Sequence, residues 1–351
     1  MSSASRAARR ASAGPVIPPF CDAHASAGAE GFRPYGSLVT DFRALHVPGD
    51  PLLLPNAWDV ASAAALAAAG FPAIGTTSLG VAAAHGLPDG RGAGRDETLA
   101  LVRRLGRLPV LLTVDVEGGF GGGPDAVADL AAYLAAAGAV GINIEDGRAG
   151  GHLAPAAEQA ALITAIKNRV PDLFVNARTD THWLGSSRVA GSGGVAGSRG
   201  VVGQGGVAGS GGVVGRGRVA GSGRVEEAGQ VEEVGLVEEA VRRALVYVEA
   251  GADGVFVPGL AGDDSIRTLT AALGVPVNVL LLPGMALPRL AALGVARVST
   301  GSMLFRAALG AAVAVARSVA RGEPGPGGLP GYAEIDALAT GKQAGKQPGK
   351  Q

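Results

Sequence analysis

The strongest constraint on the fold of this chain is an alternation in which a short apolar run is followed, eight times, by a longer helical run. Runs rich in Val, Ile and Leu are typical of buried parallel strands, whereas the longer alanine-rich runs are typical of helices. The expected strands are Leu52–Trp58, Ala73–Ser78, Val110–Val116, Val140–Glu145, Leu173–Arg178, Gly254–Val257, Val277–Leu282 and Arg297–Thr300. The expected helices are Val60–Ala69, Asp96–Leu105, Pro124–Ala137, Pro155–Arg169, Val237–Ala250, Asp263–Leu273, Pro288–Leu293 and Met303–Ala320. This pattern predicts an α/β fold, a closed (β/α)8 or TIM barrel in a single domain.

Glycine placement favours the barrel over an open doubly wound sheet, which shares the same alternation. Gly70, Gly138, Gly251 and Gly294 each follow a helical run, where a left-handed glycine caps the end of a helix. No Gly-x-Gly-x-x-Gly motif opens the helix after Leu52–Trp58, as the dinucleotide-binding form of the open sheet would require.

A six-residue repeat interrupts the alternation after the fifth strand. Valine recurs every six residues from Val189 to Val237, mostly with Gly and Ser between. A hexapeptide β-helix is one interpretation, but Arg199 and Arg224 stand where that fold needs small or apolar side chains. A segment without other core residues cannot offset its ordering entropy, so we interpret residues 186–235 as a low-complexity insertion.

The sequence therefore divides into one interrupted domain and two tails. Residues 1–36 are rich in Ser, Ala, Arg and Pro, and we expect a disordered N-terminal extension. Residues 37–320 are expected to form the catalytic barrel. Residues 321–351 end in a Gly-Lys-Gln repeat and are expected to form a flexible C-terminal tail.

Charge and cysteine content exclude several classes of function. The 30 Lys and Arg side chains are balanced by 30 Asp and Glu side chains, so the chain lacks the positive field that binding to nucleic acid or an anionic membrane requires. Cys21 is the single cysteine, which excludes an internal disulfide and a cysteine-based metal cluster and favours the cytoplasm. Apolar runs such as Val60–Gly70 are too short to span a membrane. Small metabolites are the expected ligands.

Acidic side chains mark the ends of the third and fourth expected strands, where a barrel gathers its reactive groups. Asp115 and Glu117 share one side of the first, and Glu145 ends the second. Carboxylates converging there would repel one another unless a cation lay between them, and oxygen ligands select Mg²⁺ or Mn²⁺. The alternative is that these acids are helix caps or surface charges, which is the interpretation we favour for Asp146.

Arg178 ends the fifth expected strand and has two interpretations. Its guanidinium is suited to a substrate carboxylate or phosphonate, but it is equally suited to pair with Glu145. The lysines exclude one mechanism, because none lies at the end of a strand where a Schiff base would form. These lysines are Lys167, Lys342, Lys346 and Lys350.

Five motifs, taken in order, resemble the isocitrate lyase / phosphoenolpyruvate mutase superfamily. They are Pro55-Asn56-Ala57-Trp58-Asp59, Gly86-Leu87-Pro88-Asp89, Asp115-Val116-Glu117-Gly118-Gly119-Phe120-Gly121, Ile144-Glu145-Asp146 and Ala177-Arg178-Thr179-Asp180. The resemblance covers residues 52–320 apart from the insertion. It implies a Mg²⁺-dependent barrel that holds a 2-oxo or 2-hydroxy carboxylate, with an eighth helix that is often swapped between the subunits of a homo-oligomer.

The same resemblance implies roles for individual residues. The metal ligands would be Asp115, Glu117 and Glu145, the first directly and the others directly or through water. The catalytic residues would be Asp89, on a mobile loop, and Arg178, which binds substrate and stabilises developing negative charge. The substrate carboxylate would be held by Thr77, Ser78 and Leu79.

Two departures from the superfamily pattern bear on the reaction. Residues 146–152 contain neither the Lys nor the Cys of the Lys-(Lys/Arg)-Cys-Gly-His lyase loop, and His152 is either its partial replacement or a solvated loop residue. The sixth strand is followed by Pro258 and Gly259, where the lyases have a glutamate. We expect a Mg²⁺-dependent carbon–carbon lyase working through a metal-stabilised enolate. The alternatives are a phosphonomutase or phosphonopyruvate-type enzyme acting on a C–P bond, or a catalytically impaired barrel that binds a metabolite.

Overall fold

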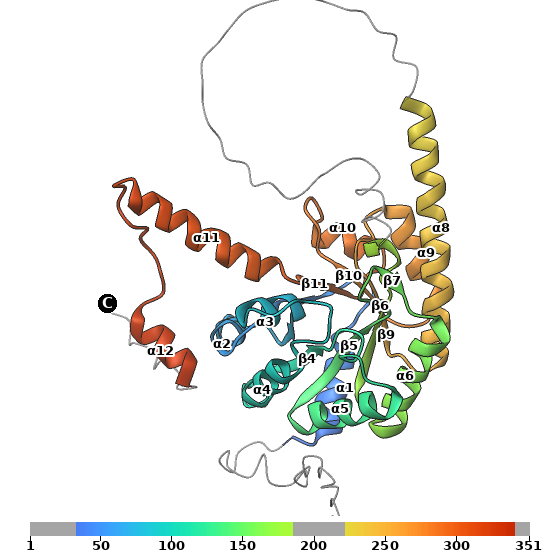
Figure 1. Cartoon of the computed structure of the whole chain (residues 1–351), viewed down its shortest axis with the longest axis horizontal. Coiled ribbons are helices and arrows are strands. Elements are labelled where there is room, and N and C mark those ends of the chain that lie inside the picture. Colours follow the sequence, from blue (N-terminus) through green and yellow to red (C-terminus); the bar gives the residue numbers. More distant parts are fainter. Residues whose placement is uncertain (1–32, 185–221, 341–351) are drawn as a thin grey trace, which may run out of the picture.

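The computed structural model describes residues 33–184 and 222–340, and its centre is one nine-stranded sheet (Figure 1). Every strand pair within this sheet is parallel, in the order β1-β11-β10-β9-β8-β5-β4-β3-β2. The strands are β1 (Leu52–Leu54), β2 (Asn56–Ala57), β3 (Ala73–Thr76), β4 (Leu111–Asp115), β5 (Ala139–Glu145), β8 (Phe174–Arg178), β9 (Gly254–Val257), β10 (Val277–Leu280) and β11 (Arg297–Ser299). The expected (β/α)8 barrel is confirmed.

The first expected strand is split in two, and its halves close the barrel. Pro55 separates β1 from β2 because proline has no N–H to donate to the sheet. β1 pairs with β11 on one side, while β2 pairs with β3 on the other. The chain on either side of the break is also bonded, since Leu54 O accepts from Thr300 N at 3.2 Å and Pro55 O accepts from Gly75 N at 2.9 Å.

Helices surround the sheet, and one follows each of the eight expected strands. In chain order the helices are α1 (Tyr35–Ala44), α2 (Val60–Ala68), α3 (Ser78–Ala84), α4 (Arg95–Leu105), α5 (Pro124–Ala136), α6 (Ala156–Arg169), α8 (Ser222–Glu249), α9 (Asp263–Ala272), α10 (Leu287–Ala292), α11 (Met303–Ala320) and α12 (Tyr332–Thr340). Helices α1, α3 and α12 and an antiparallel hairpin of β6 (Gly147–Arg148) and β7 (His152–Leu153) were not expected from the sequence.

The tails and the insertion are described only in part. Residues 1–32, 185–221 and 341–351 lie outside the described residues, and most of the expected N-terminal extension and of the hexapeptide repeat falls within them. Helix α8 begins at Ser222, inside the segment expected to be an insertion. The expected C-terminal tail contains α12, which lies against α2.

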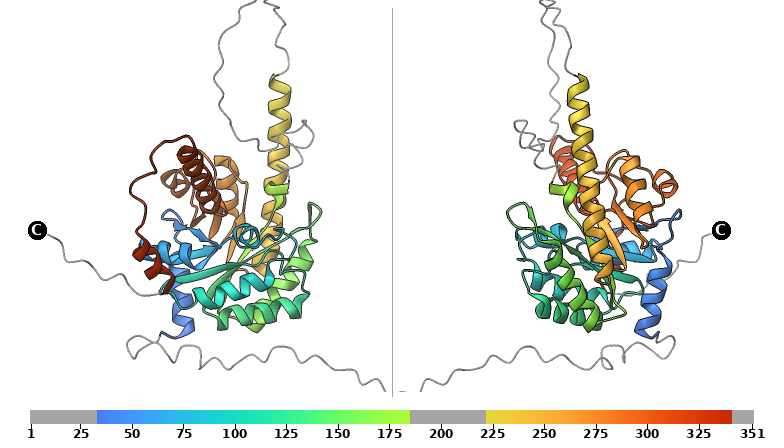
Figure 2. Two further views of the ribbon diagram at one scale, coloured as in Figure 1. Left: turned by 60° about the vertical axis from the view of Figure 1, so that its left-hand side comes forward. Right: turned by 90° about the vertical axis from the view of Figure 1, so that its right-hand side faces the viewer.

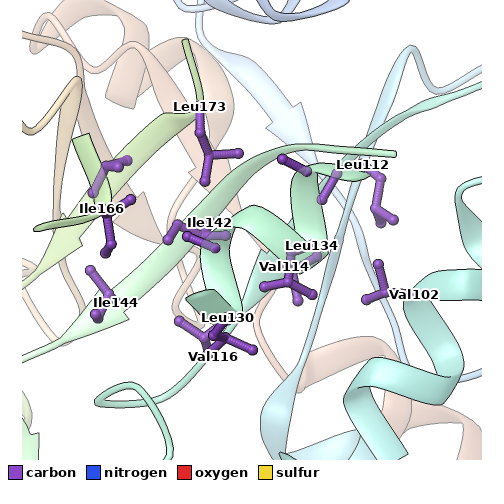
Figure 3. Close-up of a cluster of buried hydrophobic side chains, with 14 of the residues drawn as sticks. Val102, Leu112, Val114, Val116, Leu130, Leu134, Ile142, Ile144, Ile166 and Leu173 are labelled. Carbon is purple, nitrogen blue, oxygen red and sulfur yellow. The ribbon is translucent and has the colours of Figure 1, made fainter. Parts of the chain in front are cut away.

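Alternation along the strands separates an apolar outer face from a polar barrel interior. Leu112, Val114 and Val116 of the β4 segment pack with Leu130 and Leu134 of α5 in the buried cluster shown in Figure 3. A second cluster lies between α8, α9 and α10 and the strands β9, β10 and β11. These two apolar shells, the clusters between the strands and the helices, fix the positions of the strands. The alternate strand residues face the barrel interior and are not needed for this packing.

Helix α11, the eighth barrel helix, extends away from the barrel (Figure 1 and Figure 2). Phe305 is its buried residue, while Leu309, Val313 and Val319 are each at least half exposed. By length and composition α11 could cross a membrane, and it is the one such helix among the described residues. An exposed apolar helix face of this kind is typical of a surface that another protein or a membrane covers.

Candidate active site

The carboxyl ends of three neighbouring strands bring the predicted charged residues together. Asp115 is the last residue of β4, and its register partner on β5 is Asn143. Two residues further along β5, Glu145 is paired in register with Arg178, the last residue of β8. Paired positions on neighbouring strands place side chains on the same face of the sheet. Asp115, Glu145 and Arg178 therefore meet at one rim of the barrel.

Arg178 is held by two carboxylates at this rim. Its Nη1 lies 2.8 Å from Oε2 of Glu145, and its Nε donates to Oδ1 of Asp180 at 2.6 Å. Burial alone would lower the pKa of Arg178, but the carboxylates of Glu145, Asp180 and Asp115 raise it above its ordinary value. Of the two interpretations of Arg178, the structure shows the pairing with Glu145.

Asp180 is a residue of the site that sequence reasoning did not single out. It stands two positions after Arg178 and is 3% exposed, so the ion pair between them is largely shielded from water. Burial raises the pKa of Asp180, while Arg178 lowers it. The available signal was spacing, because residues two apart in extended chain share one side.

Asp115 accepts hydrogen bonds from the two loops beside it. Its Oδ2 accepts from the backbone N–H of Ser78 at 3.4 Å, and its Oδ1 accepts from that of Glu117 at 3.2 Å. The backbone N–H of Asp115 donates to Oγ1 of Thr76 at 2.9 Å. Because Ser78 is the first residue of α3, the amides at that helix start lie next to the carboxylate. Of the residues predicted to hold the substrate, Thr77 is buried and Ser78 and Leu79 are half-buried.

Glu117 has an uncommon backbone conformation. Its φ of 49° is left-handed, as is the φ of 53° at Phe120, and non-glycine residues adopt this region only where the surroundings enforce it. Oε2 of Glu117 accepts from the backbone N–H of Gly92 at 2.7 Å, and the residue is 4% exposed. The turn is tight, because a Cβ at Gly119 would lie 2.6 Å from Cγ2 of Val127. The loop thus directs Glu117 into the rim.

Asp89 lies over the same site, in the segment between α3 and α4. Burial raises its pKa, a hydrogen bond with Ser78 lowers it, and the charges of Asp115 and Arg178 act in opposite directions on it. Those interactions bring all the predicted catalytic and metal-binding residues into one neighbourhood. A carboxyl with a raised pKa is suited to holding a proton near neutral pH.

The rim holds more negative than positive charge. The carboxylates that interact there belong to Asp89, Asp115, Glu117, Glu145 and Asp180. Burial raises the pKa of Glu145 to about 8, and the neighbouring carboxylates add to that shift while Arg178 opposes it. Burial, with repulsion from Asp115 and Asp89, raises the pKa of Glu117 as well. The site therefore favours uptake of protons or of a cation.

The side chains suit a hard divalent cation held partly through water. Within the described residues, no three His, Cys, Asp or Glu side chains converge closely enough to hold a metal ion by themselves. Asp115, Glu117 and Glu145 nevertheless offer carboxylate oxygens on neighbouring elements at a rim with excess negative charge. Mg²⁺ prefers such ligands and normally keeps several of its waters. The donor set fits Mg²⁺ or Mn²⁺ on these grounds.

A cavity of about 400 Å³ adjoins Glu117 and Glu145. Strand β6 and the following Ala149 line one side of it, in the position where the sequence lacks the lyase loop. Arg148 of that hairpin donates to the backbone oxygens of Glu145 at 2.7 Å and Gly147 at 2.9 Å. A Cβ at Gly118 would collide with its guanidinium. His152 is exposed on β7, as the solvated interpretation expected.

Asp146 is neither a cap nor a surface charge, so that interpretation is wrong. It is 0% exposed and accepts from Oγ1 of Thr179 at 2.8 Å and from the backbone N–H of Asp180 at 2.9 Å. It also accepts from the hydroxyl of Tyr247 at 2.7 Å and from Nη1 of Arg243 at 3.1 Å. These last two partners lie on α8, beyond the insertion, which is why local sequence gave no sign of them.

Fold and site together define a (β/α)8-barrel protein with an acidic site at the carboxyl ends of its strands. A family model described as phosphoenolpyruvate phosphomutase matches residues 42–195 and 221–320. The chain belongs to this family, within the isocitrate lyase / phosphoenolpyruvate mutase superfamily of lyases and mutases. The resemblance drawn from the five sequence motifs is thereby confirmed.

Individual relatives agree with the family assignment. An uncharacterized protein of Mycobacterium tuberculosis is 42% identical over 296 residues, which cover 84% of this chain and 95% of the relative. The 2-methylisocitrate lyase of Bacillus subtilis is 27% identical over 249 residues, covering 68% of this chain and 66% of the lyase. A phosphonopyruvate hydrolase solved with oxalate and Mg²⁺ shares the fold, with a TM-score of 0.64 at 23% identity, covering 87% of this chain and 95% of the hydrolase.

Proposed function

We propose that this protein is a Mg²⁺- or Mn²⁺-dependent lyase that cleaves or forms a C–C bond adjacent to a 2-oxo acid, with that acid released or taken up as its enolate. The observation that carries the proposal is the meeting of Asp115, Glu117 and Glu145 with Arg178 at neighbouring strand ends. Excess negative charge at this rim calls for a cation, and the guanidinium of Arg178 is suited to a carboxylate substrate. The phosphonopyruvate hydrolase of the same fold holds Mg²⁺ and oxalate, which supports both parts.

Asp115, Glu117 and Glu145 would hold the cation. When bound, the cation supplies positive charge that stabilises the oxygens of a 2-oxo acid as negative charge develops on them. Ser78 is the first residue of α3, and its backbone N–H donates to Asp115. The same N–H is suited to the substrate carboxylate. Thr77 and Leu79 flank that position.

Arg178 would orient the substrate and stabilise the charge that develops in the transition state. Glu145 and Asp180 hold its Nη1 and Nε, so the orientation of the guanidinium is fixed before substrate arrives. Preorganised charge of this kind is among the largest contributions to catalysis. The structural ion pairs are therefore compatible with a role in substrate binding.

Asp89 would move the proton. Because burial raises its pKa, its carboxyl oxygen holds a proton at a higher pH than a solvated aspartate does. In the cleavage direction the carboxylate of Asp89 would accept the proton of the hydroxyl that becomes the carbonyl of one fragment. The resulting carboxyl would return this proton to the carbon of the other fragment, which keeps the electron pair of the broken bond, and the reverse direction would use the same transfers.

C–P bond chemistry is the second candidate, because the matching family model is that of a phosphomutase. Carbon–carbon cleavage has support in the 2-methylisocitrate lyase relative. A panel of oxaloacetate, 2-oxo and 2-hydroxy dicarboxylates and phosphonopyruvate, assayed with and without Mg²⁺, separates the two. We expect cation-dependent product from a dicarboxylate. Product from phosphonopyruvate alone would favour the second candidate, and thermal stabilisation without product would favour a metabolite-binding barrel.

A homo-oligomer and a cytoplasmic location are part of the same proposal. The exposed side chains Leu309, Val313 and Val319 give α11 an apolar face that a second subunit would cover by exchanging this helix. Analytical ultracentrifugation should show an oligomer that Val313→Glu shifts toward monomer. A monomeric wild-type protein would contradict this part of the proposal.

A further inference from the structure

The barrel interior contains a buried cation that the proposed reaction does not use. Arg297 begins β11, is 0% exposed, and is the largest of the fully buried side chains. Its register partners are Leu52 on β1 and Asn278 on β10. A guanidinium in this position fills a space that barrels ordinarily fill with aliphatic side chains.

Hydrogen bonding does not account for the burial of this charge. Nη2 of Arg297 donates to Oδ1 of Asn143 at 3.0 Å, while Nε and Nη1 have no partner among the described residues. The same Oδ1 also accepts from Nδ2 of Asn176 at 2.9 Å, so Asn143 does not depend on the arginine. Burying a guanidinium without an acidic partner is costly, so packing alone is a poor reason for Arg297.

The residue that Arg297 touches is part of the framework of the acidic rim. Asn143 is the register partner of Asp115, and its backbone oxygen accepts from Val116 N at 3.1 Å, between Asp115 and Glu117. It also stands two residues before Glu145 on β5. The side chain of Arg297 therefore reaches from β11 across the interior to β5, at the residue that is paired in register with Asp115 of β4.

The electrostatics of Arg297 also connect it with the acidic rim. Burial lowers the pKa of Arg297 to about 9, and the carboxylate of Asp115 is the charge that opposes this shift. The guanidinium and Asp115 thus interact through the barrel interior without a direct ion pair. A fixed positive charge on this side of Asp115 offsets part of the repulsion among the rim carboxylates, and it repels a cation that binds them.

We propose that Arg297 is the internal counter-charge of the acidic rim: held against Asn143, it limits how tightly the carboxylates bind a divalent cation. This inference rests on the proposed cation site and deepens it. Limited affinity keeps the cation exchangeable, and the counter-charge stabilises the carboxylate cluster while the cation is absent. The role predicts an effect of opposite sign from that of simple structural damage.

The test is isothermal titration of Mg²⁺, without substrate, into the full-length wild type and three variants. Arg297→Met removes the charge and keeps most of the side-chain length, whereas Arg297→Lys keeps the charge. Asn278→Leu is the packing control, because it exchanges an uncharged interior side chain beside Arg297 for another uncharged one of roughly similar size. Thermal melts of the cation-free proteins establish that each variant is folded.

The expected result is a dissociation constant for Mg²⁺ that falls about three- to tenfold in Arg297→Met, since a nearby like charge is gone. Arg297→Lys and Asn278→Leu should stay within about twofold of wild type. Weaker binding in Arg297→Met than in Arg297→Lys, or equal binding in all four folded proteins, would overturn the inference while leaving the cation site intact. Failure of the wild type to bind Mg²⁺ would overturn the proposed function and this inference together.

Discussion

Strands β4, β5 and β8 can be compared with β9, β10 and β11, which follow them around the barrel. Each of the first three strands ends in a charged residue, and we call these strands the charged side. Their last residues are Asp115, Glu145 and Arg178. The next three form the uncharged side; these strands end at Val257, Leu280 and Ser299. Both sides have the same parallel pairing and a buried apolar shell. The fold thus depends on side chains that face the helices, and the proposed chemistry depends on side chains at the rim.

The two sides are connected by a hydrogen bond across the barrel interior. The uncharged side contributes Arg297, whose guanidinium crosses the interior to Asn143 on the charged side. It provides no carboxylate at its strand ends, in keeping with Val257-Pro258-Gly259 in place of a lyase glutamate. A substitution on the charged side should therefore change activity and cation binding, whereas a matched substitution in the shell of the uncharged side should change stability alone.

Arg178→Lys should have the largest effect. The lysine keeps one positive charge but cannot reproduce the paired donors that meet Glu145 and Asp180. We expect kcat/KM to fall by on the order of 10³, with a thermal melting temperature close to that of wild type. Steady-state kinetics on the substrate found in the panel provide the measurement. Activity within tenfold of wild type would remove Arg178 from the mechanism.

Asp146→Ala tests whether the charged side depends on α8. The change would leave Arg243 without its buried partner and the backbone N–H of Asp180 without an acceptor. We expect the free energy of unfolding to fall by about 3–5 kcal/mol, measured by urea denaturation. The control is Asp129→Ala, which removes an exposed ion pair with Arg169 and should cost less than about 1 kcal/mol. Equal losses in the two variants would contradict the structural role of Asp146.

The pH dependence of cation binding tests the raised pKa of Glu145. Because that pKa is raised from 4.5 to about 8, the cation-free site holds a proton there that a cation must displace. Affinity for Mg²⁺ should rise about tenfold per pH unit up to about pH 8 and then level off. Between the two pKa values the folded protein binds more protons than the unfolded chain, so this group makes the cation-free protein less stable as the pH rises. A pH-independent affinity would show that Glu145 is already ionised.

A matched pair of core truncations should give the smallest effect on the site. Val114→Ala lies on the charged side, directly before Asp115, and Val279→Ala lies on the uncharged side. Each should lower the free energy of unfolding by about 2 kcal/mol. Only Val114→Ala should also weaken Mg²⁺ binding, by about two- to fivefold, because it loosens the strand that carries Asp115. Equal affinities in both variants would weaken the distinction between the two sides.

Much of the fold was predictable because local patterns encode it. Alternating apolar runs and helix-ending glycines gave all eight strands with their helices. The break at Pro55 was missed, since its use to close the barrel depends on pairing with β11 and β3 on opposite sides. Helix α3 was missed because the sequence around Ser78 reads equally well as a turn.

The candidate site divides in the same way. Asp115, Glu145 and Arg178 could be placed from their positions at strand ends, which the barrel brings together. The setting of Asp146 could not, because Arg243 and Tyr247 reach it from beyond the insertion. The burial of Arg297 could not be predicted either, because a single arginine at the start of a strand gives no local sign that its side chain points into a closed interior.

Calorimetric titration of Mg²⁺ into the wild type and Asp115→Ala, with Asp129→Ala as a surface control, tests whether the acidic rim of the barrel binds a divalent cation. We expect saturable binding of Mg²⁺ to the wild type and to Asp129→Ala, and loss of that binding in Asp115→Ala. Undiminished binding by folded Asp115→Ala protein would mean that the acidic rim of the barrel does not hold the cation.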